Sequence, residues 1–211
     1  MFWLGWIVIR SVAVVVFRIR IMDNRNIPAE GPFILACNHI SYYDPPLVGA
    51  SSPRLVHFMA KKELFRNRLF GWLISATKAH PINRRGFDRK AIEITTGILK
   101  SGQGLTIFPE GTRSQSDSFL SPHPGVGLLA RRNMVPVVPV YINGANRLKE
   151  CFLGRNRLGT IFGRPIGTDK IAEFSDDREG YRNLAVYIME RIGELKKEFL
   201  DRNGLTPEPV H

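Results

Sequence analysis

Short apolar runs alternate with amphipathic stretches along most of this chain. Residues 33–37 and 105–108 are apolar runs that end in turn residues, as buried strands do, whereas 87–100 carries apolar residues at helical spacing. The alternation predicts an α/β fold with a mixed, largely buried central sheet flanked by helices. The 211 residues and the 44% apolar content suit one domain with a sizeable core. We also predict strands at 55–60, 135–142 and 158–165, and helices at 61–70, 71–78, 126–132 and from Asp44 onward, with Asp44 as the helix cap.

Two of these predicted elements have features of their own. The strand at 135–142 contains Pro136 and Pro139, and because proline cannot donate to a ladder, we expect an edge strand or a bulge there. From Tyr181 to Phe199 apolar residues recur every three or four positions, which predicts an amphipathic helix. A helix that covers the core is the favoured interpretation, and a helix on a membrane surface is the alternative.

The N-terminus carries two apolar runs, 1–9 with two tryptophans and 12–17, separated by Arg10. A bilayer span needs about 20 nearly uncharged apolar residues, so neither run is long enough. A cleaved signal is not expected either, because no basic start and no small-residue cleavage site are present. We therefore predict a membrane-associating segment at 1–20, as a short helix in the interface, and a single domain at 21–211. A helix packed on the core and a first strand within 14–22 are the alternatives.

The charge of the chain narrows its partners without naming one. Thirty Lys and Arg against nineteen Asp and Glu give a formal charge of +11, which suits nucleic acid, an anionic lipid surface or a phosphorylated substrate. No nucleic-acid-binding module is recognisable, so nucleic acid is not expected. The two cysteines and five scattered histidines match no disulfide framework or zinc motif, and we predict no metal site.

Residues 38–45 read Asn-His-Ile-Ser-Tyr-Tyr-Asp-Pro and follow the predicted strand 33–37. Four residues separate His39 from Asp44, a spacing that would put them on different sides of a regular helix, so they can meet only across a turn. In such a turn the carboxylate can hold one ring nitrogen while the other nitrogen takes a proton. The alternative is a solvated His39 and an Asp44 that only caps the helix.

Two further turns are candidates for holding an anion. Residues 108–114 read Phe-Pro-Glu-Gly-Thr-Arg-Ser after the strand at 105–108, where Gly111 would let a ligand approach the backbone and Arg113 could grip a phosphate. Backbone N–H groups near Gly111 could also face a developing oxyanion. Residues 81–86 form a second basic turn. Each segment alone could equally be a solvated polar loop.

In this order and at these separations, the segments resemble the lysophosphatidic acid acyltransferase family of the glycerophosphate acyltransferase superfamily, over roughly residues 20–170. The residues at 135–140, Val-Pro-Val-Val-Pro-Val, resemble its fourth block, near the acyl pocket. The resemblance implies that His39 is the base and that Asp44 orients it. It further implies that the acceptor is bound by Arg84, with Arg85 as a neighbouring candidate, and by Glu110, Gly111, Thr112 and Arg113.

The function that this resemblance implies is transfer of a fatty acyl group from acyl-CoA or acyl-carrier protein to the hydroxyl of 1-acylglycerol 3-phosphate, which gives phosphatidic acid. No cofactor is implied beyond that co-substrate. The expected partners are a membrane lipid surface, the lysophospholipid and the donor, and the expected location is the cytoplasmic face of a bacterial inner membrane, as a monotopic protein. Glycerol 3-phosphate or another lysolipid is an alternative acceptor, and a non-catalytic basic module that binds membranes or nucleic acid is the alternative from another class.

The sequence departs from the family pattern in two places. Residues 122–125 read Pro-His-Pro-Gly where the family often has Phe-Lys-x-Gly, and Asn83 stands where an acid usually precedes the arginine of the second block. Both changes are expected to affect acceptor binding rather than the base. A serine hydrolase is not expected, because the Gly-x-Ser-x-Gly signature is absent. Cys37 is not expected to be a nucleophile, because its strand is predicted to be buried.

Overall fold

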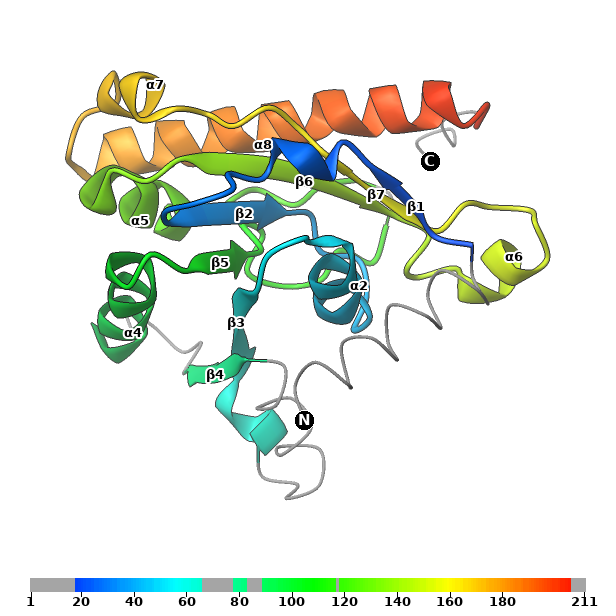
Figure 1. Cartoon of the computed structure of the whole chain (residues 1–211), viewed down its shortest axis with the longest axis horizontal. Helices are drawn as coiled ribbons and strands as arrows, with labels where there is room; N and C mark the ends of the chain where they lie inside the picture. Colours follow the sequence, from blue (N-terminus) through cyan, green and yellow to red (C-terminus); the bar gives the residue numbers. More distant parts are fainter. Residues whose placement is uncertain (1–17, 66–77, 83–88, 117, 206–211) are drawn as a thin grey trace.

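The computed structural model describes residues 18–65, 78–82, 89–116 and 118–205. A seven-stranded sheet forms its centre, in the order β1-β7-β6-β2-β5-β3-β4 (Figure 1). Neighbouring strands are parallel except for β6 and β7, which are antiparallel, so the sheet is mixed as predicted. The strands are β1 Arg20–Met22, β2 Phe33–Cys37, β3 Val56–Lys61, β4 Ala79–Ile82, β5 Gly104–Ile107, β6 Val137–Asn143 and β7 Gly159–Phe162.

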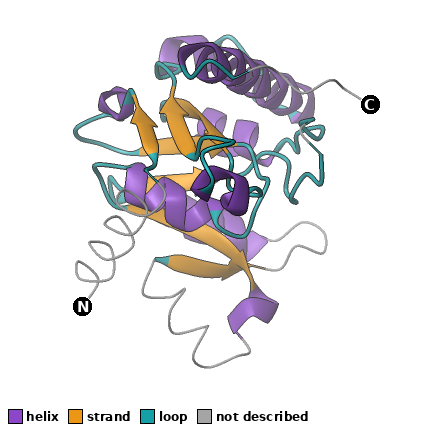
Figure 2. Cartoon of the chain, turned by 90° about the vertical axis from the view of Figure 1, so that its right-hand side faces the viewer, coloured by secondary structure: helices purple, strands orange, loops and turns teal. Residues whose placement is uncertain are grey.

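Helices cover both faces of the sheet (Figures 1 and 2). One apolar cluster joins the sheet to α4, α5, α7 and α8, and a second cluster joins its other face to α2 and α6. The long helix α8 buries ten residues, among them Leu184, Ile188 and Ile192, which confirms the prediction that it covers the core. The helices are α2 Asp44–Ser51, α4 Arg89–Lys100, α5 Gly125–Asn133, α6 Leu148–Phe152, α7 Thr168–Ala172 and α8 Arg178–Arg202, with 3-10 turns η1 Asn24–Asn26 and η2 Lys62–Phe65.

Strand β2 lies at the centre of the sheet, between β6 and β5. All five of its residues are buried, and they alternate between the two apolar clusters: Ile34 and Ala36 pack on one side, Phe33, Leu35 and Cys37 on the other. In a sheet of this kind, ligands bind beyond the carboxyl ends of the strands. The loops that follow β2 and β5 leave the sheet there, side by side, and both carry the motifs described above.

Of the two alternatives predicted for the proline-containing strand, the edge is wrong, because β6 lies between β7 and β2, and the bulge is found, although in the opposing chain. Pro136 precedes the strand, and Pro139 pairs with Ala36 of β2. On the other side of β6, Val137 pairs with Ile166 and Val140 with Phe162. Between these two pairs the opposing segment therefore has one residue more than β6. That is a β-bulge, and it lies opposite the residue that has no N–H to donate.

The remaining differences concern segment ends and gaps. Of the helix predicted at 61–70, Lys61 ends β3 and Lys62–Phe65 forms the short 3-10 turn η2. Residues 66–70, most of the predicted helix at 71–78 and residues 1–17 of the predicted membrane segment lie outside the described residues. Arg20–Met22 forms β1, within the stretch considered for a first strand. None of the helices in the described part of the chain is both long and apolar enough to cross a bilayer.

A pair of histidines joins β3 to the edge strand β4. His57 Nδ1 lies 2.8 Å from His80 Nε2, and His57 Nε2 lies 2.6 Å from the Gln103 side-chain oxygen. The oxygen can only accept, so His57 carries its proton on Nε2 and His80 donates to His57 Nδ1, with both rings neutral. Burial lowers the pKa of both histidines, and the charge of Lys78 lowers the pKa of each further.

This pair predicts a loss of stability in acid. Because the pKa values are lower in the folded than in the unfolded chain, the unfolded chain binds more protons once the pH falls below the ordinary histidine pKa of about 6.5. We expect the urea midpoint to fall between about pH 7 and pH 5, and to fall less steeply in His80→Gln, which removes one of the two groups. An equal pH dependence in the two proteins would contradict this explanation.

Candidate active site

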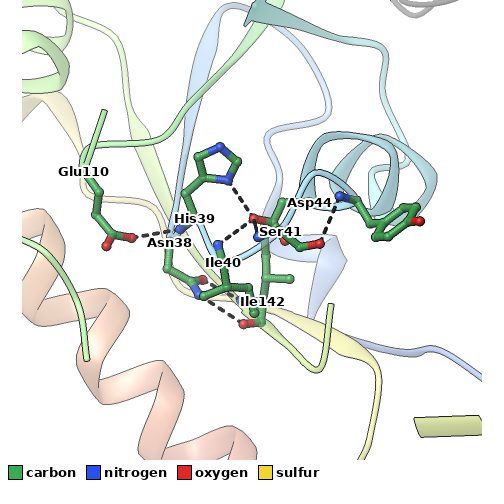
Figure 3. Close-up of polar contacts among 8 residues, drawn as sticks. Asn38, His39, Ile40, Ser41, Asp44, Glu110 and Ile142 are labelled. Carbon is green, nitrogen blue, oxygen red and sulfur yellow. Dashed lines mark hydrogen bonds and ion pairs between the residues drawn. The ribbon is translucent and has the colours of Figure 1, made fainter. Parts of the chain in front are cut away.

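His39 and Asp44 meet across the loop that joins β2 to α2 (Figure 3). His39 Nδ1 lies 2.7 Å from Asp44 Oδ2, and the side chains are 9% and 0% exposed. Because the carboxylate only accepts, Nδ1 carries the proton and Nε2 keeps its lone pair. The imidazole stacks on Phe108, with 4.2 Å between ring centroids. A base with a fixed ring orientation and tautomer is therefore present at the carboxyl end of β2.

The same carboxylate oxygen also shapes the loop. Asp44 Oδ2 accepts hydrogen bonds from the N–H groups of Ile40 at 2.7 Å and of Ser41 at 2.8 Å (Figure 3). Asp44 is the first residue of α2 rather than its cap, which is Tyr43, so the predicted capping position is wrong by one residue. A carboxylate in the first turn of a helix is stabilised by the helix dipole. Asp44 thus fixes both the ring and the backbone around His39.

Glu110, in the loop after β5, holds the other side of the His39 backbone. Its Oε1 accepts the N–H of His39 at 2.8 Å, and its Oε2 accepts the N–H of Leu120 at 2.8 Å. The residue is 1% exposed, and burial raises the pKa of its carboxyl against the lowering effect of the two N–H bonds. In this structure the carboxylate therefore faces the protein backbone rather than a substrate hydroxyl. A third bond, from the N–H of Ser114 to the carbonyl oxygen of His39 at 2.7 Å, joins the two loops again.

Arg113 and Gly111 lie in the same loop as Glu110. The guanidinium carbon of Arg113 lies 3.5 Å from the centroid of the exposed Tyr42 ring, a cation–π contact between the two motif loops. Gly111 has a φ of +66°, and a Cβ there would come within 2.6 Å of the His123 ring. Its N–H donates to the Phe108 carbonyl at 3.0 Å, so this amide closes the turn and does not face an oxyanion. For the neighbouring N–H groups the oxyanion role stays a prediction.

A family model named Acyltransferase matches residues 18–143, more than half of the chain and the part that contains both loops. The chain belongs to the acyltransferase family. Among curated proteins it is 29% identical to a 1-acyl-sn-glycerol-3-phosphate acyltransferase of Bacillus subtilis, over 85% of this chain and 89% of that one. It is 34% identical to the protein of the same name from Streptococcus pneumoniae, over 84% of this chain and 66% of the other. These matches confirm the lysophosphatidic acid acyltransferase resemblance and identify the chain as an O-acyltransferase.

A solved structure shares the fold. The crystal structure of a 1-acyl-sn-glycerophosphate acyltransferase from Thermotoga maritima aligns with a TM-score of 0.68 at 24% identity, over 90% of this chain and 79% of that one. A further curated relative is a lyso-ornithine lipid O-acyltransferase of Pseudomonas aeruginosa, 30% identical over 75% of this chain and 62% of its own length. The names of these relatives give two different acceptors, a 1-acylglycerol 3-phosphate and a lyso-ornithine lipid.

Other predicted site residues of this acyltransferase fall into two groups. Arg84, Arg85 and Asn83 lie outside the described residues. Thr112, like Arg113, is exposed on the loop after β5.

Cys37 is fully buried in β2, and burial raises the pKa of its thiol well above the usual value, which makes it a poor nucleophile. Within the described ranges, no group of three or more His, Cys, Asp and Glu side chains could hold a metal ion.

Asn38, the first residue of the motif that contains His39, supports the site from the end of β2. The Asn38 side-chain oxygen accepts the N–H of Ile142 at 2.7 Å, and its amide nitrogen donates to the Ile142 carbonyl at 3.1 Å (Figure 3). Asn38 thereby extends the pairing of β2 with β6 by side-chain bonds and fixes the point where the acyltransferase loop leaves the sheet. In the sequence, only its position directly before His39 indicates that Asn38 belongs to the site.

Substituting Glu110 should weaken both activity and stability. In Glu110→Ala the buried N–H of His39 and the part-buried N–H of Leu120 lose their acceptor, and a buried donor without a partner costs about 1–3 kcal/mol. We therefore expect the free energy of unfolding to fall by about 2–5 kcal/mol, with a lower kcat and an acceptor KM near that of the wild type. A large rise of KM with unchanged stability would show instead that Glu110 binds the acceptor. Glu173→Ala, at an exposed carboxylate directly after α7, is the control.

Proposed function

We propose that this acyltransferase moves a fatty acyl group from acyl-CoA or acyl-carrier protein to the free hydroxyl of 1-acylglycerol 3-phosphate, with phosphatidic acid as product. The observation that carries the proposal is the His39–Asp44 pair at 2.7 Å beside an arginine-containing loop at the same edge of the sheet. The names of the Bacillus and Streptococcus relatives support this acceptor.

His39 supplies the proton transfer in this mechanism. Its Nε2 takes the proton of the acceptor hydroxyl as that oxygen attacks the thioester carbonyl. The tetrahedral species then expels the thiolate, which takes the proton back from the imidazolium and leaves as the thiol. Asp44 stabilises the imidazolium through Nδ1–H, because its carboxylate is already in place before the reaction. The acyl group goes directly to the acceptor and never to a protein side chain.

The acceptor is held by the loop after β5. Arg113 and Thr112 are assigned to its phosphate together with Arg84, since a guanidinium matches a phosphate with two parallel hydrogen bonds, and Gly111 is assigned to the turn that carries them. The Tyr42 ring keeps the Arg113 guanidinium beside the loop that carries His39. Binding both groups in one place turns a bimolecular encounter into an oriented reaction. Glu110 is assigned to the loop backbone and not to the acceptor.

Replacing Arg113 by alanine should act on the acceptor alone. We expect the KM for 1-acylglycerol 3-phosphate to rise about tenfold or more, since charge-assisted bonds contribute about 1.5–3 kcal/mol each, while the donor KM stays within about twofold. Arg178→Ala, at an exposed arginine at the start of α8, should leave both values unchanged. An unchanged acceptor KM in Arg113→Ala would exclude Arg113 as a phosphate ligand.

A comparison of substrates tests which acceptor the enzyme uses. The purified protein is given palmitoyl-CoA or palmitoyl-carrier protein with 1-acylglycerol 3-phosphate, glycerol 3-phosphate or a lyso-ornithine lipid, and the lipid products are identified by mass spectrometry. The proposal predicts phosphatidic acid as the fastest product. The lyso-ornithine lipid tests the alternative that the Pseudomonas relative supports. Preference for either other acceptor would replace the proposed substrate and keep the chemistry.

The proposed location is the cytoplasmic face of a bacterial inner membrane, with the apolar runs 1–9 and 12–17 at the membrane interface, whereas Ile19 and Arg20 belong to the folded domain. Tryptophans prefer the headgroup depth of a bilayer, and Trp3 and Trp6 lie in the first of these runs. Such a placement keeps the acyl chains of the acceptor and the product in the lipid.

A further inference from the structure

The loop between β6 and β7 carries two of the most exposed large apolar side chains in the described part of the protein. Phe152 is 68% exposed and Leu153 is 62% exposed. They end the short helix α6, at the end of the molecule seen on the right in Figure 1. Neighbouring apolar residues that both face solvent on a loop tip mark an interaction surface, whereas single exposed ones need no explanation.

Helix α6 is built so that these side chains point outward. Leu148 and Cys151 pack into the cluster beneath the sheet, and residues three apart share a face of a helix. Phe152 follows Cys151 directly and is exposed, as are Lys149 and Glu150. This short helix therefore packs Leu148 and Cys151 on the core and leaves the side chain at its last position in solvent.

The base of this loop is held by hydrogen bonds. The Asn143 side chain at the end of β6 donates to the Arg157 carbonyl at 2.7 Å and to the Asn156 side-chain oxygen at 3.0 Å. The N–H of Arg155 donates to the Glu150 carbonyl at 2.9 Å. The tip is therefore presented by a closed loop whose two ends are tied together.

The loop that carries the apolar tip is rich in basic residues. Residues 144–158 contain four basic side chains and a single acidic one, Glu150, which lies 4.0 Å from Arg147. Lys149, Arg155 and Arg157 are exposed. Exposed apolar side chains in one loop with exposed Lys and Arg match an anionic lipid surface, where the apolar groups enter the interface and the cations meet phosphates.

The tip lies at the same edge of the sheet as His39. Strands β2 and β6 are parallel neighbours, with Cys37 paired to Val140, so the loops that follow them leave the sheet on the same side. The β2 loop exposes Tyr42 and Tyr43 next to His39. An aromatic pair and an apolar tip at one edge could face one surface together.

We propose that the α6 tip, residues 149–155, is a second membrane-attachment surface, which inserts Phe152 and Leu153 into an anionic bilayer and holds the His39 edge against it. The proposal rests on the proposed function in that a lipid acceptor must reach His39 from the bilayer. A protein partner fits less well, because a stable protein interface needs about 800 Å² per partner and the tip offers two apolar side chains.

The first test measures where the tip lies. The full chain carries an environment-sensitive fluorophore on a cysteine introduced by Phe152→Cys, and the matched control carries it at Met134→Cys, an exposed apolar position before the start of β6, at the opposite end of that strand. Cys37 and Cys151 are both buried, so the native thiols are protected from labelling. Vesicles of phosphatidylglycerol and phosphatidylcholine should shift the emission of the probe at 152 to the blue and leave the probe at 134 unchanged. No shift at 152, or a shift that grows with protein concentration without vesicles, would overturn the proposal.

The second test measures attachment strength. Phe152→Ser with Leu153→Ser should weaken partition into the anionic vesicles at least about tenfold. Lys149→Gln with Arg155→Gln should weaken it about fivefold per charge, and added salt should remove that difference. Val186→Ser, at an exposed apolar position on α8, should bind like the wild type. Equal partition of all variants would contradict the proposal.

Acyl transfer in detergent micelles separates this inference from the proposed function. The tip variants should retain wild-type turnover there, because detergent delivers the acceptor without a bilayer. If the wild type is inactive in micelles but still inserts its tip into vesicles, the proposed function is excluded and the membrane-attachment surface is supported. If the wild type is active but its tip stays in water, the attachment surface is excluded and the proposed function is supported.

Discussion

Replacing His39 by alanine is expected to lower kcat for phosphatidic acid formation by about 10²–10⁴-fold, the usual contribution of a positioned general base. The Asp44 contact uses Nδ1 of the ring and leaves the basic lone pair of Nε2 available for the acceptor proton. Substrate KM values should change little, because the loop backbone is held by Asp44 and Glu110 and not by the ring. The measurement is product formation under saturating donor and acceptor.

The variant also has to remain folded for this result to be interpreted. The bonds to the backbone of residues 39–41 all survive the substitution, so the unfolding midpoint and the attachment to vesicles should match those of the wild type. Imidazole added in solution should restore part of the activity, because it can replace the missing base. Turnover close to that of the wild type in His39→Ala would remove His39 from the mechanism.

Asp44 is expected to show an effect of similar size on catalysis and a larger one on stability. In Asp44→Asn the amide oxygen takes the place of Oδ2, because the N–H groups of Ile40 and Ser41 need an acceptor there, so it also accepts from Nδ1–H and the tautomer is kept. The negative charge that stabilises the imidazolium is lost, and we expect kcat to fall by about 10²-fold, since a charge-assisted hydrogen bond contributes about 1.5–3 kcal/mol. In Asp44→Ala the N–H groups of Ile40 and Ser41 also lose their acceptor, so the free energy of unfolding should fall by about 2–5 kcal/mol.

The comparison of the two Asp44 variants separates the effect of the charge from the effect on folding. Asparagine keeps the shape and one acceptor oxygen, and its stability should therefore lie between those of alanine and the wild type. Urea unfolding and steady-state kinetics on the same preparations give both values. Wild-type turnover in Asp44→Asn would show that the carboxylate only supports the loop. Asp201→Asn, at an exposed carboxylate near the end of α8, serves as the control.

Local patterns were enough to predict the elements that position the site. The run at 33–37 and the helical spacing from Tyr181 to Phe199 correspond to β2 and α8, because each pattern reports directly which faces are buried. The His39–Asp44 contact followed from a spacing that only a turn can close. The basic residues within 147–157 did not predict a membrane surface from the sequence alone, because only the structure shows which side chains of this loop are exposed.

Other features depend on contacts between distant segments. Glu110 has the same place in the sequence whether its carboxylate faces a ligand or the backbone, and only the fold brings the N–H groups of His39 and Leu120 to it. The central position of β6 was missed for a similar reason. Pro139 is accommodated by a bulge in the opposing chain, around residues 163–165, that the sequence of β6 does not contain.

The central claim is direct transfer by a histidine base, and thiol release from palmitoyl-CoA tests it most directly. The purified protein in detergent is mixed with palmitoyl-CoA, with and without 1-acylglycerol 3-phosphate, and free thiol is followed from the first turnover. The mechanism predicts release that requires the acceptor, without a burst, and that is lost in His39→Ala. A burst of one thiol per protein without acceptor would reveal an acyl-enzyme, and acceptor-dependent release that persists in His39→Ala would contradict the assignment of the base.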